Sequence, residues 1–383
     1  MIDHSSDSKM IAIVTYENYP DGSPGAIRNH SFATALSQMG HNVEVIHKGE
    51  ETHRSSIRQK SLYRNNKYSK WLLFWWRVIS ELRKLHKSEG LDAVIIYSCG
   101  LLLGMWLIKH WCKRHNVKIV FDVVEWYSKE QFKHGAMAYN YQEKQIQNTR
   151  IIDKECRVIT ISGFLENYYN QKGCITTRIP IIWNKECLAD ASKIISSSRR
   201  NFIYAGSHFE MDNIPLILES IKLLPIECRL KMRFDVYGFT ESFIKSRIGD
   251  EDWEKIKDVV VAHGRQPNSV VLEAYRNSDF TILLRDPSYR VNQAGFPSKV
   301  IESMAQGVSI MCNYSSDLKD FLIDGENSII VKDLNAESVA QSMTRIIELS
   351  TSEVKQLRLN AIETVGKGFC MEQYFKKFES VLN

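Results

Sequence analysis

Apolar runs of strand length alternate with amphipathic segments along most of this chain. Val- and Ile-rich runs such as 10–16 and 92–97 have the composition of buried parallel strands, and the segment 27–39 carries apolar residues at helical spacing. A run of lysine, serine and arginine at 193–200 interrupts this alternation, which then begins again. The pattern predicts an α/β protein with two Rossmann-like domains. The expected strands are 10–16, 40–46, 92–97, 117–124, 157–162 and 179–184 in the first half and 201–206, 233–237, 259–262, 279–285 and 308–312 in the second.

The two halves of the pattern set the domain boundaries that we expect. Residues 1–182 form an N-terminal domain and residues 183–369 a C-terminal domain, which suits a chain of 383 residues. The last segment, 370–383, is an amphipathic helix whose pattern allows it to pack on either domain.

Composition excludes several classes of protein. The chain is 44% hydrophobic and 25% charged, which is normal for a globular protein, and its net charge is only +5. Its 8 cysteines show no CxxC or other metal-binding spacing, so we expect reduced thiols and no metal site. The N-terminus has no signal-peptide pattern and the apolar runs are shorter than a membrane span. We therefore expect a cytoplasmic protein.

The stretch 295–313 carries the clearest candidate chemistry. Pro297 suits the first position of a helix, Gly307 suits the position after its end, and a buried strand follows. Lys299 and Glu302, three residues apart, share the polar face of this helix. A lysine beside the free amides of a helix start is typical of a phosphate site, although a solvated surface pair gives the same pattern.

The preceding strand favours the phosphate site. The run 279–285 reads as a strand that ends in Arg285, and a polar loop then leads to Gly295. Ligands of open parallel sheets bind beyond the carboxyl ends of the strands, so Arg285, Gly295 and Lys299 are expected to converge on one crevice.

The N-terminal half offers fewer candidates. The turn-rich loop 20–26 lacks the dinucleotide fingerprint, but Gly25 would let the backbone approach a ligand, or it simply permits a tight turn. Asp122 and Glu125 lie at the end of a strand, where a carboxylate binds substrate hydroxyls, acts as a general base or merely caps the strand.

A basic and aromatic segment, 54–87, differs from the rest of the chain. Cations and interfacial aromatic residues together are typical of a segment that lies on an anionic bilayer. The alternatives are a helix that packs its tryptophans into the core and, third, a nucleic-acid contact, for which no reading module is present. We expect no nucleic-acid partner. The predicted membrane-contact residues are Lys67, Lys70, Trp71, Trp75, Trp76 and Arg77.

Several motifs in order resemble the retaining GT-B glycosyltransferases of family four. The resemblance rests on 295–313, on Gly206-Ser207 after the first strand of the second half and on the Ile161-Ser162 turn, and it covers nearly the whole chain. It implies two Rossmann-like domains that face an interdomain cleft, with the nucleotide sugar bound by the C-terminal domain and the acceptor by the N-terminal one. It also implies that the last helix crosses back to the first domain.

The resemblance also implies roles for individual residues. Glu302 matches the glutamate that binds the ribose hydroxyls of the nucleotide, and Arg265 belongs to the turn beside the base. Arg285 and Lys299 would bind the diphosphate, and with Glu125 they are the predicted catalytic residues. The predicted donor-binding residues are Gly25, Gly206, Ser207, Arg265, Gly295, Phe296, Pro297, Ser298 and Glu302.

Three positions depart from the pattern of the family. Ala294 stands where the first motif glutamate is expected. Ser207 and the neighbourhood of Asp212 lack the usual arginine and lysine, and Glu125 would have to replace the histidine of the N-terminal domain.

We expect a retaining transferase, peripheral on the inner membrane face, that takes a sugar from a UDP- or GDP-linked donor, without a cofactor. The acceptor is expected to be a glycan or lipid-linked, in bacterial surface polysaccharide synthesis. The departures favour one alternative, a non-catalytic GT-B protein that binds a partner or a sugar nucleotide. A GT-B sugar-nucleotide epimerase is a second alternative.

Overall fold

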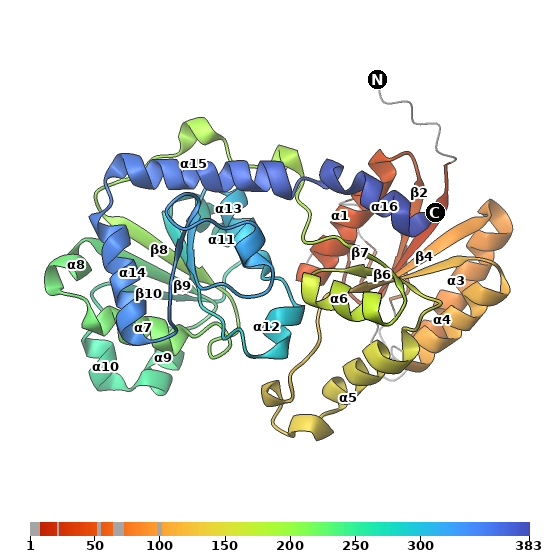
Figure 1. The fold of residues 1–383 in the computed structure, drawn as a ribbon, viewed down its shortest axis with the longest axis horizontal. Helices are drawn as coiled ribbons and strands as arrows, with labels where there is room; N and C mark the ends of the chain where they lie inside the picture. The colour runs from red at the N-terminus through yellow and green to blue at the C-terminus, as the bar shows by residue number, and fades with distance from the viewer. Residues whose placement is uncertain (1–7, 21–22, 52–54, 64–72, 98–101) are drawn as a thin grey trace. The chain divides into compact units, whose positions relative to one another are not determined.

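The computed structural model describes residues 8–20, 23–51, 55–63, 73–97 and 102–383. The chain divides into two compact units (Figure 1). Unit 1 comprises Met1–Ile182, Gln293–Phe296 and Met371–Asn383, and unit 2 comprises Trp183–Asn292 and Pro297–Cys370.

Unit 1 is built on a 7-stranded parallel sheet with strand order β3-β2-β1-β4-β5-β6-β7. Its strands are β1 Met10–Thr15, β2 Asn42–His47, β3 Arg58–Ser61, β4 Leu91–Tyr97, β5 Lys118–Val123, β6 Arg157–Thr160 and β7 Ile175–Arg178. Its helices are α1 Pro24–Gln38, α3 Phe74–Glu89, α4 Leu102–Arg114, α5 Tyr139–Ile146, α6 Gly163–Gln171 and α16 Phe375–Leu382.

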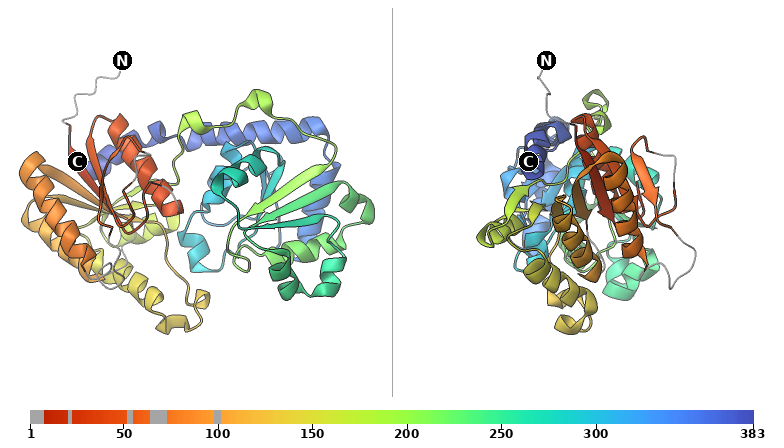
Figure 2. Two further views of the ribbon diagram at one scale, coloured as in Figure 1. Left: turned by 180° about the vertical axis from the view of Figure 1, so that it is seen from behind. Right: turned by 90° about the vertical axis from the view of Figure 1, so that its right-hand side faces the viewer.

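Apolar helix faces cover both sides of this sheet. Phe32 of α1 and Phe378 of α16 join one core cluster with residues of the central strands, whereas α3 and α4 pack against the other face (Figures 1 and 2). The last strand is β7 rather than the expected 179–184, and β3 was not predicted from the basic segment. Both are short edge strands, which carry little hydrophobic signal.

Unit 2 is built on a 6-stranded parallel sheet with strand order β10-β9-β8-β11-β12-β13. Its strands are β8 Arg200–Ala205, β9 Met232–Tyr237, β10 Val260–Gly264, β11 Phe280–Leu283, β12 Ser309–Cys312 and β13 Ser328–Ile330. Its helices are α7 Ile214–Leu223, α8 Ile226–Leu230, α9 Glu241–Ile248, α10 Asp250–Glu254, α11 Asn268–Arg276, α12 Arg290–Ala294, α13 Ser298–Ala305, α14 Ala336–Glu348 and α15 Thr351–Gly368.

Helix α13 begins and ends close to the predicted positions. Pro297 lies at its N-cap, and Gly307 follows the helix with φ +74°, a left-handed conformation that glycine adopts without strain. Val300, Ile301 and Met304 are buried, so the opposite side of α13 presents its polar residues at the carboxyl edge of the sheet.

Candidate functional site

A cluster of charged side chains in unit 2 centres on the carboxylate of Asp212, in the loop between β8 and α7. Its Oδ1 accepts a hydrogen bond from Nε of Arg285 at 3.0 Å, and its Oδ2 forms an ion pair with Nζ of Lys299. Tyr204, at the end of β8, donates its hydroxyl to the same Oδ2 at 2.8 Å. Three segments that are distant in sequence thus meet at the carboxyl edge of the sheet, as expected for Arg285 and Lys299.

The cluster carries a net positive charge. The Asp212 side chain is completely buried. Burial raises the pKa of Asp212, but the two cations and their hydrogen bonds outweigh it, and the resulting pKa lies below the ordinary value. One buried carboxylate therefore balances one of two cations, which leaves one positive charge for an anionic ligand.

Two asparagines fix the main chain around Arg285. Asn313, after β12, accepts a hydrogen bond from the backbone N–H of Arg285 at 2.8 Å and donates to its carbonyl at 2.7 Å. Asn213 donates to the carbonyl of Leu284 at 3.1 Å. The guanidinium is therefore held at its base and through Nε. Among the described residues no partner is found for its Nη1 or Nη2, which remain free to bind an oxyanion in a forked geometry.

Gly206 makes room for the ammonium of Lys299. A Cβ at this position would lie 2.5 Å from the Tyr204 hydroxyl and would collide with the end of the Lys299 side chain. The absence of a side chain lets Lys299 reach back from α13 to the end of β8. Ser207, the next residue, is exposed.

Glu302 lies one turn after Lys299 on α13. Burial raises the pKa of this carboxyl above its ordinary value, while hydrogen bonding with Ser298 and the charge of Lys299 act in the opposite direction. No described side chain caps the start of α13 at Pro297. The N-terminal turn thus offers backbone amides as well as Lys299 to an anion.

The remaining predicted donor-binding residues lie in different parts of the chain. Arg265 follows β10 and is exposed. Gly295 and Phe296 group with unit 1, as does Gly25 in the first turn of α1. A Cβ on Gly25 would lie 2.6 Å from the Tyr97 hydroxyl, so this glycine serves close packing inside unit 1.

In unit 1, the two carboxylates predicted at the end of β5 have different environments. Asp122 is buried and forms a bidentate pair with Arg28, with Nε–Oδ2 and Nη2–Oδ1 distances of 2.8 Å, so it is no candidate for contact with a substrate. Glu125 is partly exposed, accepts a hydrogen bond from the Tyr127 hydroxyl at 2.5 Å, and lies 3.8 Å from Nζ of Lys144.

The predicted membrane-contact residues separate into three groups. Lys67, Lys70 and Trp71 lie outside the described residues. The prediction for Trp75 is wrong: its side chain is only 2% exposed, because it packs against Gly104 of α4, where a Cβ would lie 2.7 Å from Trp75 Cε2. Trp76, one residue further around α3, is 63% exposed, and Arg77 is partly exposed. No helix in the described ranges is long and apolar enough to cross a membrane.

Sequence analysis did not identify Asp212, Tyr204 and Asn313 as members of the site. In the sequence, Asp212 stands out only because it lies where the family has a lysine. An unexpected acid near the predicted cations was the available signal, since a buried cation pair requires a counter-charge. Within the described part of the chain, no group of three or more histidine, cysteine, aspartate or glutamate residues is arranged to hold a metal ion.

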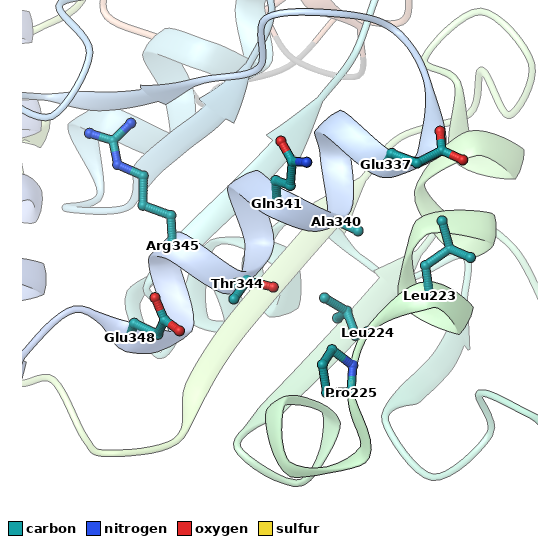
Figure 3. A pocket seen from close by; sticks show the side chains of 9 residues that line it. All are labelled: Leu223, Leu224, Pro225, Glu337, Ala340, Gln341, Thr344, Arg345 and Glu348. Carbon is teal, nitrogen blue, oxygen red and sulfur yellow. The ribbon is translucent and has the colours of Figure 1, made fainter.

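A pocket of about 500 Å³ lies elsewhere on unit 2, between the end of α7 and the outer face of α14 (Figure 3). Leu223, Leu224 and Pro225 form one wall, and Gln341 and Thr344 belong to the other. Helix α7 starts at the carboxyl edge of the sheet and ends at the opposite edge, so this pocket is remote from Lys299. None of the predicted site residues lines it.

Known proteins resemble this chain in two ways: a family model matches most of unit 2, and solved structures match both units. Residues 189–364 match the family model described as glycosyl transferases group 1, and this range contains Asp212, Arg285, Lys299 and Glu302. The match supports a glycosyltransferase. No curated protein matches the sequence.

Solved structures resemble the whole chain. Sucrose-phosphate synthase from Thermosynechococcus elongatus superposes with a TM-score of 0.72 at 15% identity, over 97% of this chain and 98% of that one. HepE from Anabaena, in complex with UDP-glucose, gives 0.70 at 11% identity over 97% and 99%. WaaG, a glycosyltransferase involved in lipopolysaccharide biosynthesis, gives 0.68 at 12% identity over 97% and 99%. The predicted fold class, α/β with two parallel sheets as in GT-B glycosyltransferases, is confirmed.

Proposed function

We propose that this protein transfers a sugar from a nucleotide-diphosphate sugar to an acceptor hydroxyl with retention at the anomeric carbon. The observation that carries the proposal is the cation pair of Arg285 and Lys299, which Asp212 holds at the carboxyl edge of unit 2. This pair lies within the range that matches the glycosyl transferases group 1 model. HepE, which has a similar fold, is solved with UDP-glucose. We infer a UDP- or GDP-linked donor.

The proposed chemistry is electrostatic rather than covalent. The free Nη groups of Arg285, the ammonium of Lys299 and the first amides of α13 would bind the diphosphate and stabilise the charge that develops on it. A bond forms between the acceptor oxygen and the anomeric carbon, while the bond from that carbon to the phosphate oxygen breaks. Its electron pair leaves with the nucleoside diphosphate, which also takes the hydroxyl proton. Glu302 would bind the ribose hydroxyls, and Glu125 would orient the acceptor hydroxyl.

We further infer a glycan or lipid-linked acceptor in bacterial surface polysaccharide synthesis. Support comes from four apolar side chains of unit 1: Leu73 and Trp76 at the start of α3, and Leu103 and Trp106 at the start of α4. We refer to these four residues together as the apolar patch. All four are exposed, and α3 packs directly on α4. Arg77, the residue after Trp76 on α3, adds a cation to the same helix. Exposed tryptophans beside cations suit an anionic membrane surface.

The membrane part of the proposal has its own test. Changing Trp76 and Trp106 together to serine should reduce binding to anionic phosphatidylglycerol vesicles at least tenfold in a sedimentation assay. Met137→Ser is the matched control, since Met137 is exposed in unit 1 but lies on neither helix. Undiminished vesicle binding by the double variant would contradict this role of the patch.

Donor binding is tested by calorimetric titration with a panel of UDP- and GDP-linked sugars, together with a hydrolysis assay for each. We expect one donor to bind and to be hydrolysed slowly. Conversion of the donor to an isomer would indicate the epimerase instead, and the absence of binding to any of them would contradict the proposal.

A non-catalytic GT-B protein remains the second candidate, because Ala294 occupies the position of the first motif glutamate. That protein would bind a donor without hydrolysing it and without transferring the sugar to any acceptor. The calorimetric titration and the hydrolysis assay together therefore separate the two candidates.

A further inference from the structure

Unit 1 contains a buried lysine whose ammonium lacks a close partner. Lys144 of α5 has 8% of its side chain exposed. Its nearest carboxylate is Glu125 Oε1, 3.8 Å from Nζ, and the Tyr127 ring lies 5.8 Å away. Among the described residues, no hydrogen-bond acceptor for this ammonium is found. A buried ammonium is costly unless oxygen atoms surround it, so the position favours a ligand that supplies them.

The groups around Lys144 lie at the carboxyl edge of the sheet, after the strand next to its central strand β4. Glu125 follows β5, which lies between β4 and β6. Its Oε1 already accepts a hydrogen bond from the Tyr127 hydroxyl at 2.5 Å, which fixes the carboxylate and leaves Oε2 available. Tyr127 thus orients Glu125, and its ring lies 5.8 Å from the Lys144 ammonium. An anionic acceptor and a cationic donor, Glu125 and Lys144, therefore lie side by side.

The combination of charges selects one class of ligand. A phosphate or carboxylate would meet repulsion from Glu125, and a protonated amine would meet repulsion from Lys144. A hydroxyl group donates to a carboxylate and accepts from an ammonium at the same time. Two neighbouring hydroxyls of a sugar ring can satisfy both charged groups.

We propose that Glu125, Tyr127 and Lys144 form a subsite for an uncharged sugar, which binds through its ring hydroxyls. This inference rests on the proposed transferase function and names the chemical class of its acceptor: the reacting end is a neutral sugar, not a phosphate or an amino sugar. Glu143, on the turn of α5 that carries Lys144, is the other nearby carboxylate, and burial raises its pKa. Its Oε1 accepts a hydrogen bond from the Tyr139 hydroxyl at 3.1 Å, so it has a partner other than Lys144.

The test uses the full chain and three probes: methyl α-glucoside, glucose 6-phosphate and glucosamine. Binding is followed by saturation-transfer NMR, with each sugar at concentrations up to about 20 mM, because isolated monosaccharides bind with millimolar affinity at best. We expect the neutral glycoside to bind more strongly than the other two. Equal or stronger binding of the phosphate or the amine would overturn the proposal, and so would the absence of glycoside binding.

Two variants connect binding to these side chains. Glu125→Gln and Lys144→Met should each weaken glycoside binding at least tenfold. Lys113→Met is the matched control, since Lys113 is an exposed lysine of unit 1 that pairs with Glu155 at the surface. Glycoside binding that is unchanged in Lys144→Met would overturn the proposal.

Donor titration of the same variants separates this proposal from the proposed function. Glu125→Gln and Lys144→Met should bind the UDP- or GDP-sugar as the parent protein does, which also shows that they are folded. Loss of donor binding in both would assign them a structural role instead. Failure of donor binding in the parent protein, with glycoside binding intact, would contradict the transferase and leave the sugar subsite standing.

Discussion

Each unit contains a buried aspartate that pairs with an arginine near the end of a strand. The two pairs differ in how many N–H donors of the arginine remain available to a ligand. Arg28 uses Nε and Nη2 on Asp122, donates Nη1 to the carbonyl of Pro180 at 2.7 Å and donates Nη2 to that of Ile179 at 2.9 Å. Arg285 gives only Nε to Asp212. The first pair is neutral, and Arg28 uses four of its five N–H donors, so this pair holds unit 1 together. The second pair shares its carboxylate with Lys299, and its arginine uses one N–H donor on Asp212. We call them the saturated and the unsaturated pair.

This difference shows how to separate a structural ion pair from a binding site. Burial and a short distance are common to both pairs, and neither property alone indicates function. What distinguishes them is the count of unsatisfied donors and of uncompensated charge. By the number of unsatisfied donors and uncompensated charges, the ligand-binding site lies at Asp212, whereas Asp122 is part of the core of unit 1.

Removing the arginine of the saturated pair should have the largest effect. Arg28→Ala leaves the Asp122 carboxylate buried without a counter-charge, so the free energy of unfolding of unit 1 should fall by about 3–5 kcal/mol. Urea denaturation followed by tryptophan fluorescence measures this change. Lys113→Ala is the surface control and should cost less than about 1 kcal/mol. A loss from Arg28→Ala as small as that of the control would remove the distinction between the two pairs.

The cations of the unsaturated pair should matter for ligand binding instead. Arg285→Ala and Lys299→Ala should each weaken binding of the nucleotide sugar at least tenfold, about 1.4 kcal/mol, because each removes a charged donor to the diphosphate. Calorimetric titration measures the affinity. Glu302→Ala should weaken donor binding to a similar extent, because it removes the carboxylate proposed to bind the ribose hydroxyls.

Arg28, in contrast to Arg285 and Lys299, should have no effect on donor binding. Folded Arg28→Ala protein should bind the donor normally at a temperature where unit 1 is intact. If Lys299→Ala bound the donor as the parent does, the assignment of the diphosphate to this cluster would be wrong.

Much of this architecture could be predicted, because it depends on local patterns. Buried strands such as β1 and β12 consist mainly of apolar residues, and the end of α13 just before Gly307 follows from the conformational freedom of glycine. Asp212 could not be assigned, since its partners lie far away in the sequence and only the fold brings them together. For the same reason the sequence leaves the role of Asp122 open: it shows that this residue lies at the end of a strand, but it does not show the pairing with Arg28.

Trp75 and Trp76 show a different limit. The basic and aromatic composition of the segment predicts membrane contact for both, although adjacent residues on a helix point about 100° apart. The spacing of apolar residues along α3 distinguishes the two. Trp75 lies three, four and seven residues before the buried Val78, Ile79 and Leu82, on the same face of the helix, whereas Trp76 does not share this spacing.

Crowding the cluster should have a smaller effect than removing a cation. In Gly206→Ala the added methyl group meets the Tyr204 hydroxyl and the end of Lys299, so the ammonium must move away from the end of β8. We expect donor affinity to fall about fivefold, or roughly 1 kcal/mol. Gly366→Ala on α15 is the control, since its Cβ would meet only Leu188 Cδ1 at an ordinary 3.7 Å. An affinity equal to that of the control would mean that the position of Lys299 at Gly206 is unimportant for binding.

The smallest effect concerns acid stability. The folded-state pKa of Asp212 is lower than its unfolded value, so its contribution to stability is fully present above the unfolded pKa of about 3.9 and is lost as the pH falls through the folded pKa. Asp212→Asn has no such titration. The difference in melting temperature between parent and variant should therefore be constant from neutral pH down to about pH 5 and should narrow below about pH 4. A difference that stays constant to pH 3 would mean that Asp212 does not gain its stability from Arg285 and Lys299. In that case the contrast between the two aspartates would rest on ligand binding alone.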